Sequence, residues 1–312
     1  MTGRLEGRRL LVSGASGLLG SALTARAAAE GADVVKLVRR PVTSTDEVQW
    51  DPAANRLDAS VVEGVDVVVH LSGAVIVGKR WSARRRAVLR SSRIDSARLL
   101  ADAIGTALSP PDVFLSGSAI GYYGSRGDEV LTEASGPGDL SPGAPAAFLA
   151  QLCIDWEAAT LPAGETGTRV VNLRSGLVLD GRRGVLKPLL PLFRAGLGGK
   201  LSDGSQWMSW IAIDDHVAAL IHLMDSGLSG SVNIVAPNPV RNTEFTETLG
   251  ALLHRPTVLR VPGAALHARL GREEAQGSAL ASLRVIPECL VDDGFDFSYP
   301  ELEGALGHML VS

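Results

Sequence analysis

The stretch that decides the fold is SGASGLLG, residues 13–20, with glycines at positions 14, 17 and 20. An apolar run at residues 10–12 predicts a strand just before it, and Leu19, Leu23 and Ala27 share one face of the helix that follows. Glycines in a strand-to-helix turn let a phosphate approach the backbone, and the helix N-terminus offers free N–H groups and a partial positive charge. We therefore predict a dinucleotide-phosphate site here rather than an ordinary tight turn.

The alternation of strand and helix continues along the first half of the chain. Further apolar runs predict buried strands at residues 34–38, 65–71, 113–115 and 170–173. Strand, helix and strand in repetition indicate an α/β fold, a doubly wound parallel sheet (Rossmann fold). We place this dinucleotide-binding domain at residues 1–176 and a smaller C-terminal α+β lobe at residues 177–312, with some elements, at about residues 208–236, returning to the main sheet.

The composition is that of a globular protein without a nucleic-acid or membrane partner. Of 312 residues, 46% are hydrophobic and 21% are charged, and the net charge of -4 gives no attraction to nucleic acid or to acidic membranes. No apolar run approaches the roughly 18 residues of a membrane span. The only cysteines, Cys153 and Cys289, and the six histidines show no metal-ligand spacing. Because no signal peptide is visible, we expect a cytoplasmic protein without a bound metal.

The end of the second predicted strand indicates which dinucleotide binds. An NAD site places an acidic residue there to bind the ribose 2′-hydroxyl. This chain has Arg39 and Arg40 instead, and its nearest acid, Asp33, lies at the other end of the strand. Guanidinium groups form bidentate bonds with phosphate, so the pair favours the 2′-phosphate of NADP(H). The alternative is a pair of solvated arginines at a strand end.

Several motifs in a fixed order resemble the extended short-chain dehydrogenase/reductases, in the NAD(P)-dependent epimerase/dehydratase group. The broad ones are the glycine turn, VVVHLSGA at residues 67–74 and SGS at residues 116–118. Narrower ones are similar to the epimerase-family (short-chain reductase 39U-like) subfamily, and they lie at residues 78–81, 117–124, 173–179, 210–215 and 239–242. Residues 294–297 resemble the small C-terminal domain of that subfamily. The resemblance covers essentially the whole chain.

The resemblance implies a set of cofactor-binding residues. The pyrophosphate would lie on the turn formed by Gly14, Ser16, Gly17, Leu18, Leu19 and Gly20. The adenosine-ribose side would be lined by Leu71, Ser72, Gly73 and Ala74. The remaining motif residues assigned to the cofactor are Ser116, Gly117 and Arg174, and Ser118 would occupy the position of the catalytic serine.

The chain departs from the family that it resembles at the catalytic dyad. The wider family uses Tyr-x-x-x-Lys, whereas Phe148 and Leu152 stand at the corresponding positions here. Without a lysine to lower its pKa, a tyrosine stays neutral near pH 7. We therefore predict Ser118 and Tyr123, rather than its neighbour Tyr122, as neutral hydrogen-bond donors to the substrate oxygen. Such donors favour reduction over base-driven oxidation.

Two other clusters have competing interpretations. Lys79, Arg80 and Trp81 follow a cofactor-side strand, and they serve either as a substrate contact or as packing between the two parts of the chain. Asp214-Asp215-His216 resembles a catalytic cluster, but a helix N-cap followed by a first-turn acid explains it more simply.

The sequence as a whole predicts an NADP(H)-dependent oxidoreductase or epimerase. Hydride transfer at a carbonyl or carbinol carbon is the expected reaction, and a nucleotide-sugar-like molecule is one candidate small-molecule substrate. A homodimer is compatible with the sequence. The competing hypothesis is a protein that binds NADP(H) as a sensor and performs no chemistry, and the absent Tyr-x-x-x-Lys dyad supports it.

Overall fold

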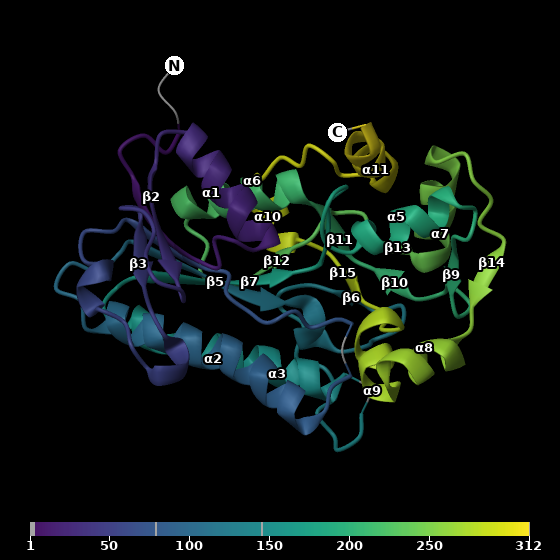
Figure 1. The fold of residues 1–312 in the computed structure, drawn as a ribbon, viewed down its shortest axis with the longest axis horizontal. Coiled ribbons are helices and arrows are strands. Elements are labelled where there is room, and N and C mark those ends of the chain that lie inside the picture. Colours follow the sequence, from purple (N-terminus) through teal and green to yellow (C-terminus); the bar gives the residue numbers. More distant parts are fainter. Residues whose placement is uncertain (1–3, 79, 145, 312) are drawn as a thin grey trace.

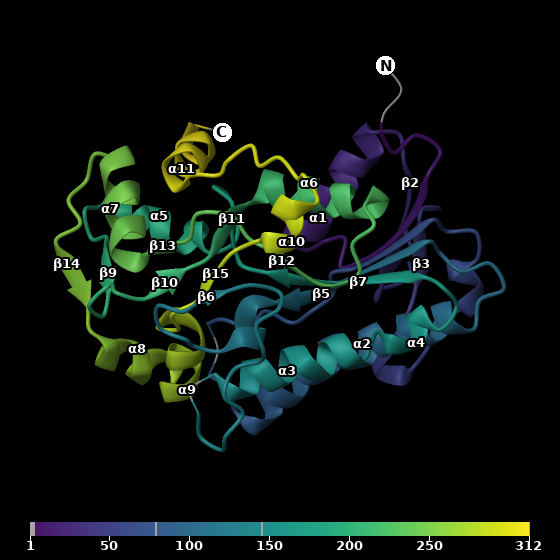
Figure 2. The ribbon, with the colours of Figure 1, turned by 180° about the vertical axis from the view of Figure 1, so that it is seen from behind.

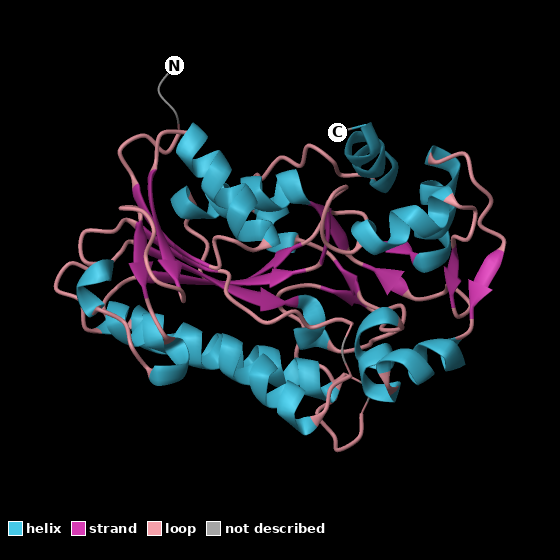
Figure 3. Ribbon diagram, in the orientation of Figure 1, coloured by secondary structure: helices cyan, strands magenta, loops and turns pink. Residues whose placement is uncertain are grey.

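A parallel sheet of seven strands forms the centre of the molecule (Figure 1, Figure 3). The computed structural model describes residues 4–78, 80–144 and 146–311. The strands run in the order β12-β7-β5-β4-β1-β2-β3, and each neighbouring pair is parallel. Their bounds are β1 Arg9–Ser13, β2 Asp33–Val38, β3 Glu47–Gln49, β4 Val67–His70, β5 Val113–Ala119, β7 Arg169–Ser175 and β12 Gly230–Ile234. The predicted doubly wound parallel sheet is confirmed.

Helices cover both faces of the sheet (Figure 1, Figure 2). One face is covered by α1 (Leu18–Ala29) and α6 (Ile213–Asp225), and the other by α2 (Ala83–Gly105), α3 (Ala147–Ala158) and α4 (Leu161–Gly164). Leu10 and Val12 point into the core beside α1 and α6, whereas Leu11 between them points into the core beside α2. This alternation explains why the strands are apolar on both faces. In the described part of the chain, no helix is long and apolar enough to cross a membrane.

The C-terminal lobe packs around its own core, which includes Phe193, Trp210 and Phe245. Its helices are α5 (Leu186–Arg194), α7 (Asn242–Leu252), α8 (Gly263–Leu270), α9 (Arg272–Glu274) and α11 (Leu302–Val311). Short paired strands join it together: β9 (Gly199–Leu201) with β14 (Leu259–Val261), β10 (Trp207–Met208) with β13 (Val240–Arg241), β8 (Leu177–Leu179) with β11 (Trp210–Ala212), and β6 (Val130–Leu131) with β15 (Arg284–Val285). After β11 the chain forms α6 and then β12, which is the edge strand of the main sheet beside β7.

The start of α6 differs in detail from the sequence interpretation. The N-cap is Ala212, so Asp214 lies in the first turn and does not cap the helix. The Asp215 carboxylate accepts hydrogen bonds from the backbone N–H groups of Ser298 and Tyr299, each at 2.9 Å. This carboxylate therefore attaches the segment before α11 to the main domain, which is a structural role.

Two buried histidines connect elements of the main domain. His70, at the end of β4, has Nδ1 at 2.6 Å from Ser13 Oγ and Nε2 at 3.1 Å from Ser96 Oγ. His216, on α6, has Nε2 at 2.9 Å from Ser175 Oγ. Burial lowers the pKa of each imidazole to about 3, so both rings are neutral near pH 7.

We predict that acid weakens the fold through these two rings. In the unfolded chain a histidine takes up a proton near pH 6.5, whereas in the folded chain it does so near pH 3, so the unfolded state binds more protons between these values. The free energy of unfolding should fall as pH drops below about 6.5, by up to about 1.4 kcal/mol per pH unit for each ring. His216→Gln should reduce this slope between about pH 6 and 5 in urea titrations. An unchanged slope in the variant would contradict the assignment.

Candidate functional site

The glycine turn after β1 is shaped by close approach of the backbone. Gly14 has a φ of +75°, and a Cβ there would lie 2.7 Å from the backbone carbonyl carbon of Leu71. A Cβ on Gly20 would overlap the carbonyl oxygen of Gly14, so this third glycine lets α1 pack against the turn. Gly17 is the exposed N-cap of α1, and no side chain caps the helix. The first N–H groups of α1 therefore remain available to an anion.

Arg183 adds a cation at this helix start, and sequence reasoning missed it. Its Nη1 donates to Ser21 Oγ at 2.6 Å, and its Nη2 donates to the backbone oxygen of Ser16 at 3.3 Å. The predicted residues Leu18 and Leu19 form the first turn of α1 below it. The contact joins positions 162 apart in the chain, so the only sequence signal was the place of Arg183 in a basic, glycine-rich loop.

The run predicted to line the adenosine-ribose side follows β4 and lies next to the glycine turn. Leu71 contacts the turn directly, and Ser72 and Gly73 come after it. A Cβ on Gly73 would lie 3.1 Å from the guanidinium carbon of Arg93, and the backbone oxygen of Ala74 accepts a hydrogen bond from Arg93 Nη2 at 2.9 Å. The run therefore extends from the glycine turn to a buried arginine that the sequence analysis did not single out.

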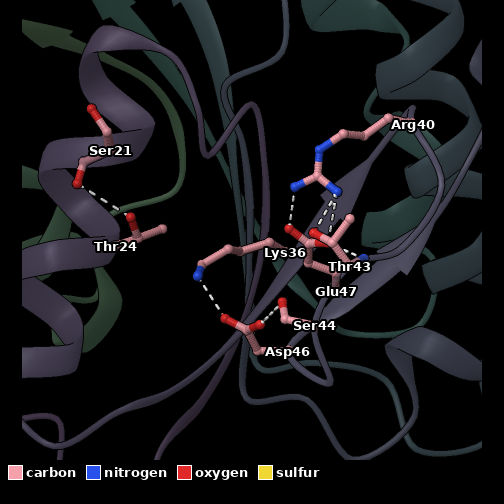
Figure 4. Close-up of polar contacts among 8 residues, drawn as sticks. All are labelled: Ser21, Thr24, Lys36, Arg40, Thr43, Ser44, Asp46 and Glu47. Atoms are coloured by element: carbon pink, nitrogen blue, oxygen red, sulfur yellow. Dashed lines mark hydrogen bonds and ion pairs between the residues drawn. The ribbon is translucent and has the colours of Figure 1, made fainter.

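The two arginines at the end of β2 have different surroundings, and Figure 4 shows those of Arg40. Arg40 donates to both carboxylate oxygens of Glu47, at 2.5 and 2.9 Å, and to Thr43 Oγ1 at 2.9 Å. This hydrogen-bonded arginine lowers the pKa of Glu47 to about 2. Sequence reasoning did not place Glu47 beside Arg40, because the two meet only when β3 pairs with β2. In that parallel pairing Glu47 lies opposite Lys36, and no local pattern predicts it. Arg39 is exposed and makes no hydrogen bond or ion pair within the described residues.

A buried ion pair organises the carboxyl ends of the central strands. Glu157 on α3 accepts from Arg174 Nε at 2.9 Å and from Arg174 Nη2 at 2.8 Å. Ser118 Oγ donates to the same carboxylate at 2.6 Å, and Ser231 Oγ donates at 3.0 Å. Burial alone would lower the pKa of Arg174, but the hydrogen bonds and charge of Glu157 outweigh burial and raise it. The guanidinium of Arg174 is therefore charged and is bound by two hydrogen bonds to the Glu157 carboxylate.

This network engages the hydroxyls that were predicted to contact substrate. Tyr123 is fully buried, and its hydroxyl donates to Asn233 Oδ1 at 2.7 Å and accepts from Arg174 Nη1 at 3.0 Å. Burial raises the pKa of Tyr123 to about 12. The Tyr122 ring lies 3.5 Å from the guanidinium carbon of Arg174 and packs edge-on against Tyr123. The arrangement argues against the predicted donor roles of Ser118 and Tyr123.

Three residues predicted to bind the cofactor also face this interior. Arg174 is 4% exposed and is bound to Glu157, as described above. Ser116 is fully buried, and a Cβ on Gly117 would lie 2.9 Å from the Trp156 ring. Gly117 therefore permits α3 to pack against β5, and the geometry favours structural roles for all three.

An apolar pocket of about 400 Å³ lies between the ends of β5 and β7 and the C-terminal lobe. Its walls include Ala119, Leu152, Trp156, Gly176, Phe193 and Phe245. Leu152 stands where the resembled family has its lysine, so the site offers no lysine at that position. Cys153 also lines the pocket, and burial raises its pKa to about 12. The thiol is therefore protonated near pH 7 and is a poor nucleophile.

Ser175 lines this pocket. It is the last residue of β7 and pairs in register with Ala119, the last residue of β5. His216 Nε2 lies 2.9 Å from Ser175 Oγ, while His216 Nδ1 has no partner within the described residues. If the ring proton is on Nε2, Nδ1 is an unpaired acceptor, and no N–H group of the ring is left without a partner. In this tautomer the Nε2–H group donates to Ser175 Oγ. The hydroxyl of Ser175 donates only a long hydrogen bond, at 3.4 Å, to the backbone oxygen of Leu173, and a ligand oxygen in the pocket would compete with this acceptor.

The predicted substrate cluster packs against the lobe instead of lining the pocket. Lys79 lies outside the described residues. Arg80 donates to the backbone oxygen of Ala268 at 2.5 Å, which connects it to α8. Trp81 is 7% exposed, and its ring centre lies 5.3 Å from that of Phe148. Of the two interpretations left open by the sequence, the geometry of Arg80 and Trp81 favours packing.

We predict that Glu157→Gln destabilises the protein strongly. The amide would leave the buried guanidinium of Arg174 without a counter-charge, which typically costs about 3–5 kcal/mol. Urea unfolding at pH 7 measures the change. Glu165→Gln is the matched control, because Glu165 is exposed at the end of α4 and should change stability by less than about 0.5 kcal/mol. A loss at position 157 no larger than in the control would show that the pair does not hold the strand ends.

Comparison with known proteins agrees with this architecture. A curated epimerase family protein of Mycobacterium bovis is 41% identical over 298 residues, which cover 95% of this chain and 96% of the relative. The human epimerase family protein SDR39U1 is 35% identical over 301 residues, which cover 96% of this chain and 98% of the relative.

Solved structures and family patterns agree with these relatives. The crystal structure of human SDR39U1 (isoform2) with NADPH superposes with a TM-score of 0.88 at 33% identity, and the match covers 97% of this chain and 99% of that one. Residues 261–309 match a domain of unknown function (DUF1731). Residues 10–235 match the NAD dependent epimerase/dehydratase family, and the chain belongs to that family.

Proposed function

We propose that the protein binds NADP(H) and uses it to reduce a carbonyl group of a small apolar molecule. The observation that carries the proposal is the position of two features at one edge of the parallel sheet. The glycine turn follows β1 at this edge, and the pocket begins at the last residues of β5 and β7. In doubly wound sheets ligands bind at the carboxyl ends of the strands.

The residues at the glycine turn fit a dinucleotide. The uncapped, exposed start of α1 and the side-chain-free Gly14 and Gly17 form a cradle that a pyrophosphate would fill. Arg183, which contacts Ser16 and Ser21 at this helix start, would supply a counter-charge to the pyrophosphate. Arg39, the unpaired cation at the end of β2, favours a 2′-phosphate, and the human relative crystallised with NADPH supports this choice.

The pocket supports reduction better than oxidation. Bound NADPH would supply the hydride. The apolar walls exclude water, and Ser175 would donate a hydrogen bond to the oxygen on which negative charge develops. In the described part of the pocket no side chain offers the base that alcohol oxidation needs. A nucleotide sugar is polar and doubly charged, so these apolar walls fit it less well than they fit an apolar carbonyl compound.

The second candidate function, an NADP(H) sensor, rests on two observations. The tyrosine and lysine positions of the family are Phe148 and Leu152, and the hydroxyl of Tyr123 already has two protein partners. A sensor needs the cofactor site but no catalytic groups. Single-turnover oxidation of bound NADPH, followed by its absorbance with a panel of hydrophobic aldehydes and ketones, decides between the two. Oxidation of NADPH by any of these compounds supports the reductase. If none of them oxidises NADPH, the result supports the sensor.

We predict that Arg39 sets the preference for NADPH over NADH. Arg39→Ala should lower the preference by about tenfold or more, which corresponds to about 1.4 kcal/mol, because the 2′-phosphate loses its unpaired cation. The control is the double variant Arg40→Ala/Glu47→Ala, which removes a mutually neutralised pair and should leave the preference within about threefold. Calorimetric titration with both cofactors measures this. A larger loss in the double variant than in Arg39→Ala would overturn the assignment.

We predict that Ser175→Ala slows hydride transfer by a factor of about 10² to 10³ while NADPH affinity stays within a few-fold. Ser118→Ala is the matched control, because its hydroxyl is bound to Glu157 and should change the rate only a few-fold. The rate of NADPH oxidation under single-turnover conditions is measured with the best substrate of the panel. The original sequence-based assignment requires the reverse order of the two effects, so the comparison decides between them.

A further inference from the structure

Arg93, on α2, is a buried cation without a counter-charge. It is 6% exposed, and no carboxylate within the described residues forms an ion pair with it. Its Nη2 donates to the backbone oxygen of Ala74 at 2.9 Å, and its Nη1 makes longer contacts with the Leu89 carbonyl at 3.3 Å and Ser92 Oγ at 3.5 Å. The Nε–H group has no partner. All of its protein partners are therefore neutral.

Such an arrangement is costly for the folded protein. A buried charge loses its hydration, and neutral hydrogen-bond partners replace only part of it. Burial, with a smaller effect of the nearby charge of Arg85, lowers the pKa of Arg93 to about 10, so the group remains protonated near pH 7. The adjacent Cys153 is a neutral thiol and provides no compensation. Uncompensated buried charges are typical of sites at which a ligand supplies the missing charge.

Arg93 lines the pocket described above. Arg93 is the single charged side chain among the described residues that line it, and its neighbours there include Leu152, Cys153 and Trp156. The guanidinium carbon lies 5.2 Å from the centre of the Trp156 ring, which holds the side chain in place. A ligand in this pocket therefore meets apolar walls and one cation.

We propose that Arg93 binds an oxyanion, a carboxylate or a phosphate, that belongs to a substrate whose body is apolar. The proposal rests on the proposed function, because it takes the pocket to be the substrate site, and it names the class of substrate: a small apolar carbonyl compound with one anionic group. A phosphate of the cofactor has the same chemistry, and the experiment separates this source from the substrate.

The test is ligand binding by calorimetry to the full chain, with and without saturating NADPH. The probes are straight-chain carboxylates from hexanoate to dodecanoate, the corresponding alkyl phosphates and the corresponding alcohols. In the unmodified protein, the carboxylate or phosphate of some chain length should bind at least about tenfold more tightly than its alcohol. Equal affinities of anions and alcohols throughout the series would overturn the proposal.

Variants of Arg93 locate the effect. Arg93→Met should remove the preference for the anion, leave alcohol binding within about threefold, and leave NADPH affinity within about threefold. Arg93→Lys keeps the charge and should keep most of the preference. The control, Arg98→Met, removes an exposed arginine from the same helix and should change neither quantity. Because the methionine replaces an uncompensated charge, we expect Arg93→Met to fold, which thermal unfolding checks.

Two outcomes with Arg93→Met would overturn the proposal. A tenfold loss of NADPH affinity would assign the guanidinium to the cofactor, and an unchanged preference for the anion would place the oxyanion elsewhere. Failure of the proposed function is distinguishable from both. The anion preference is measured without any turnover, and loss of NADPH binding in the unmodified protein would appear in its own titration.

Discussion

The buried pair of Glu157 and Arg174 is the interaction on which the arrangement of the site depends. One carboxylate on α3 receives hydrogen bonds from β5, β7 and β12, so it holds three neighbouring strands against one helix. The pair also orients the hydroxyls of Ser118 and Tyr123 away from the pocket, because both have partners in the network. These polar groups therefore bind to one another inside the main domain, and the walls of the pocket are mostly apolar.

This separation changes what the fold can do with a dinucleotide. In the family that the sequence resembles, a tyrosine and a lysine form the acid-base pair at the positions of Phe148 and Leu152. Here the pocket residues to which we assign a role toward substrate are Ser175 on β7 and Arg93 on α2. Neither group is a base near pH 7, since an arginine with a pKa of about 10 remains protonated. The chemistry that suits them is stabilisation of negative charge.

The parts that could be predicted from the sequence were the local ones. The glycine turn needs only one strand, one turn and one helix, and all of them lie within residues 9–29. The pairing of Arg40 with Glu47 and the position of Arg183 over α1 depend on which segments pack together, and no local pattern encodes that. Alternation of side chains along β5 could have predicted that Ser118 and Ala119 point to opposite faces of the sheet. Ala119 lines the pocket, so Ser118 lies on the other face.

A comparison of the two buried arginines explains why only one of them is assigned to a ligand. Arg174 is bound by a carboxylate in a bidentate pair, and its charge is neutralised inside the protein. Arg93 is buried to a similar extent, but its acceptors are two backbone carbonyls and a hydroxyl. Removing the partner of a buried charge costs several kcal/mol, so a folded chain that retains such an unpartnered charge has sacrificed stability at that point. Proteins retain such a cost mainly at functional sites, and Arg93 lines the pocket in which we propose that a ligand supplies the missing charge.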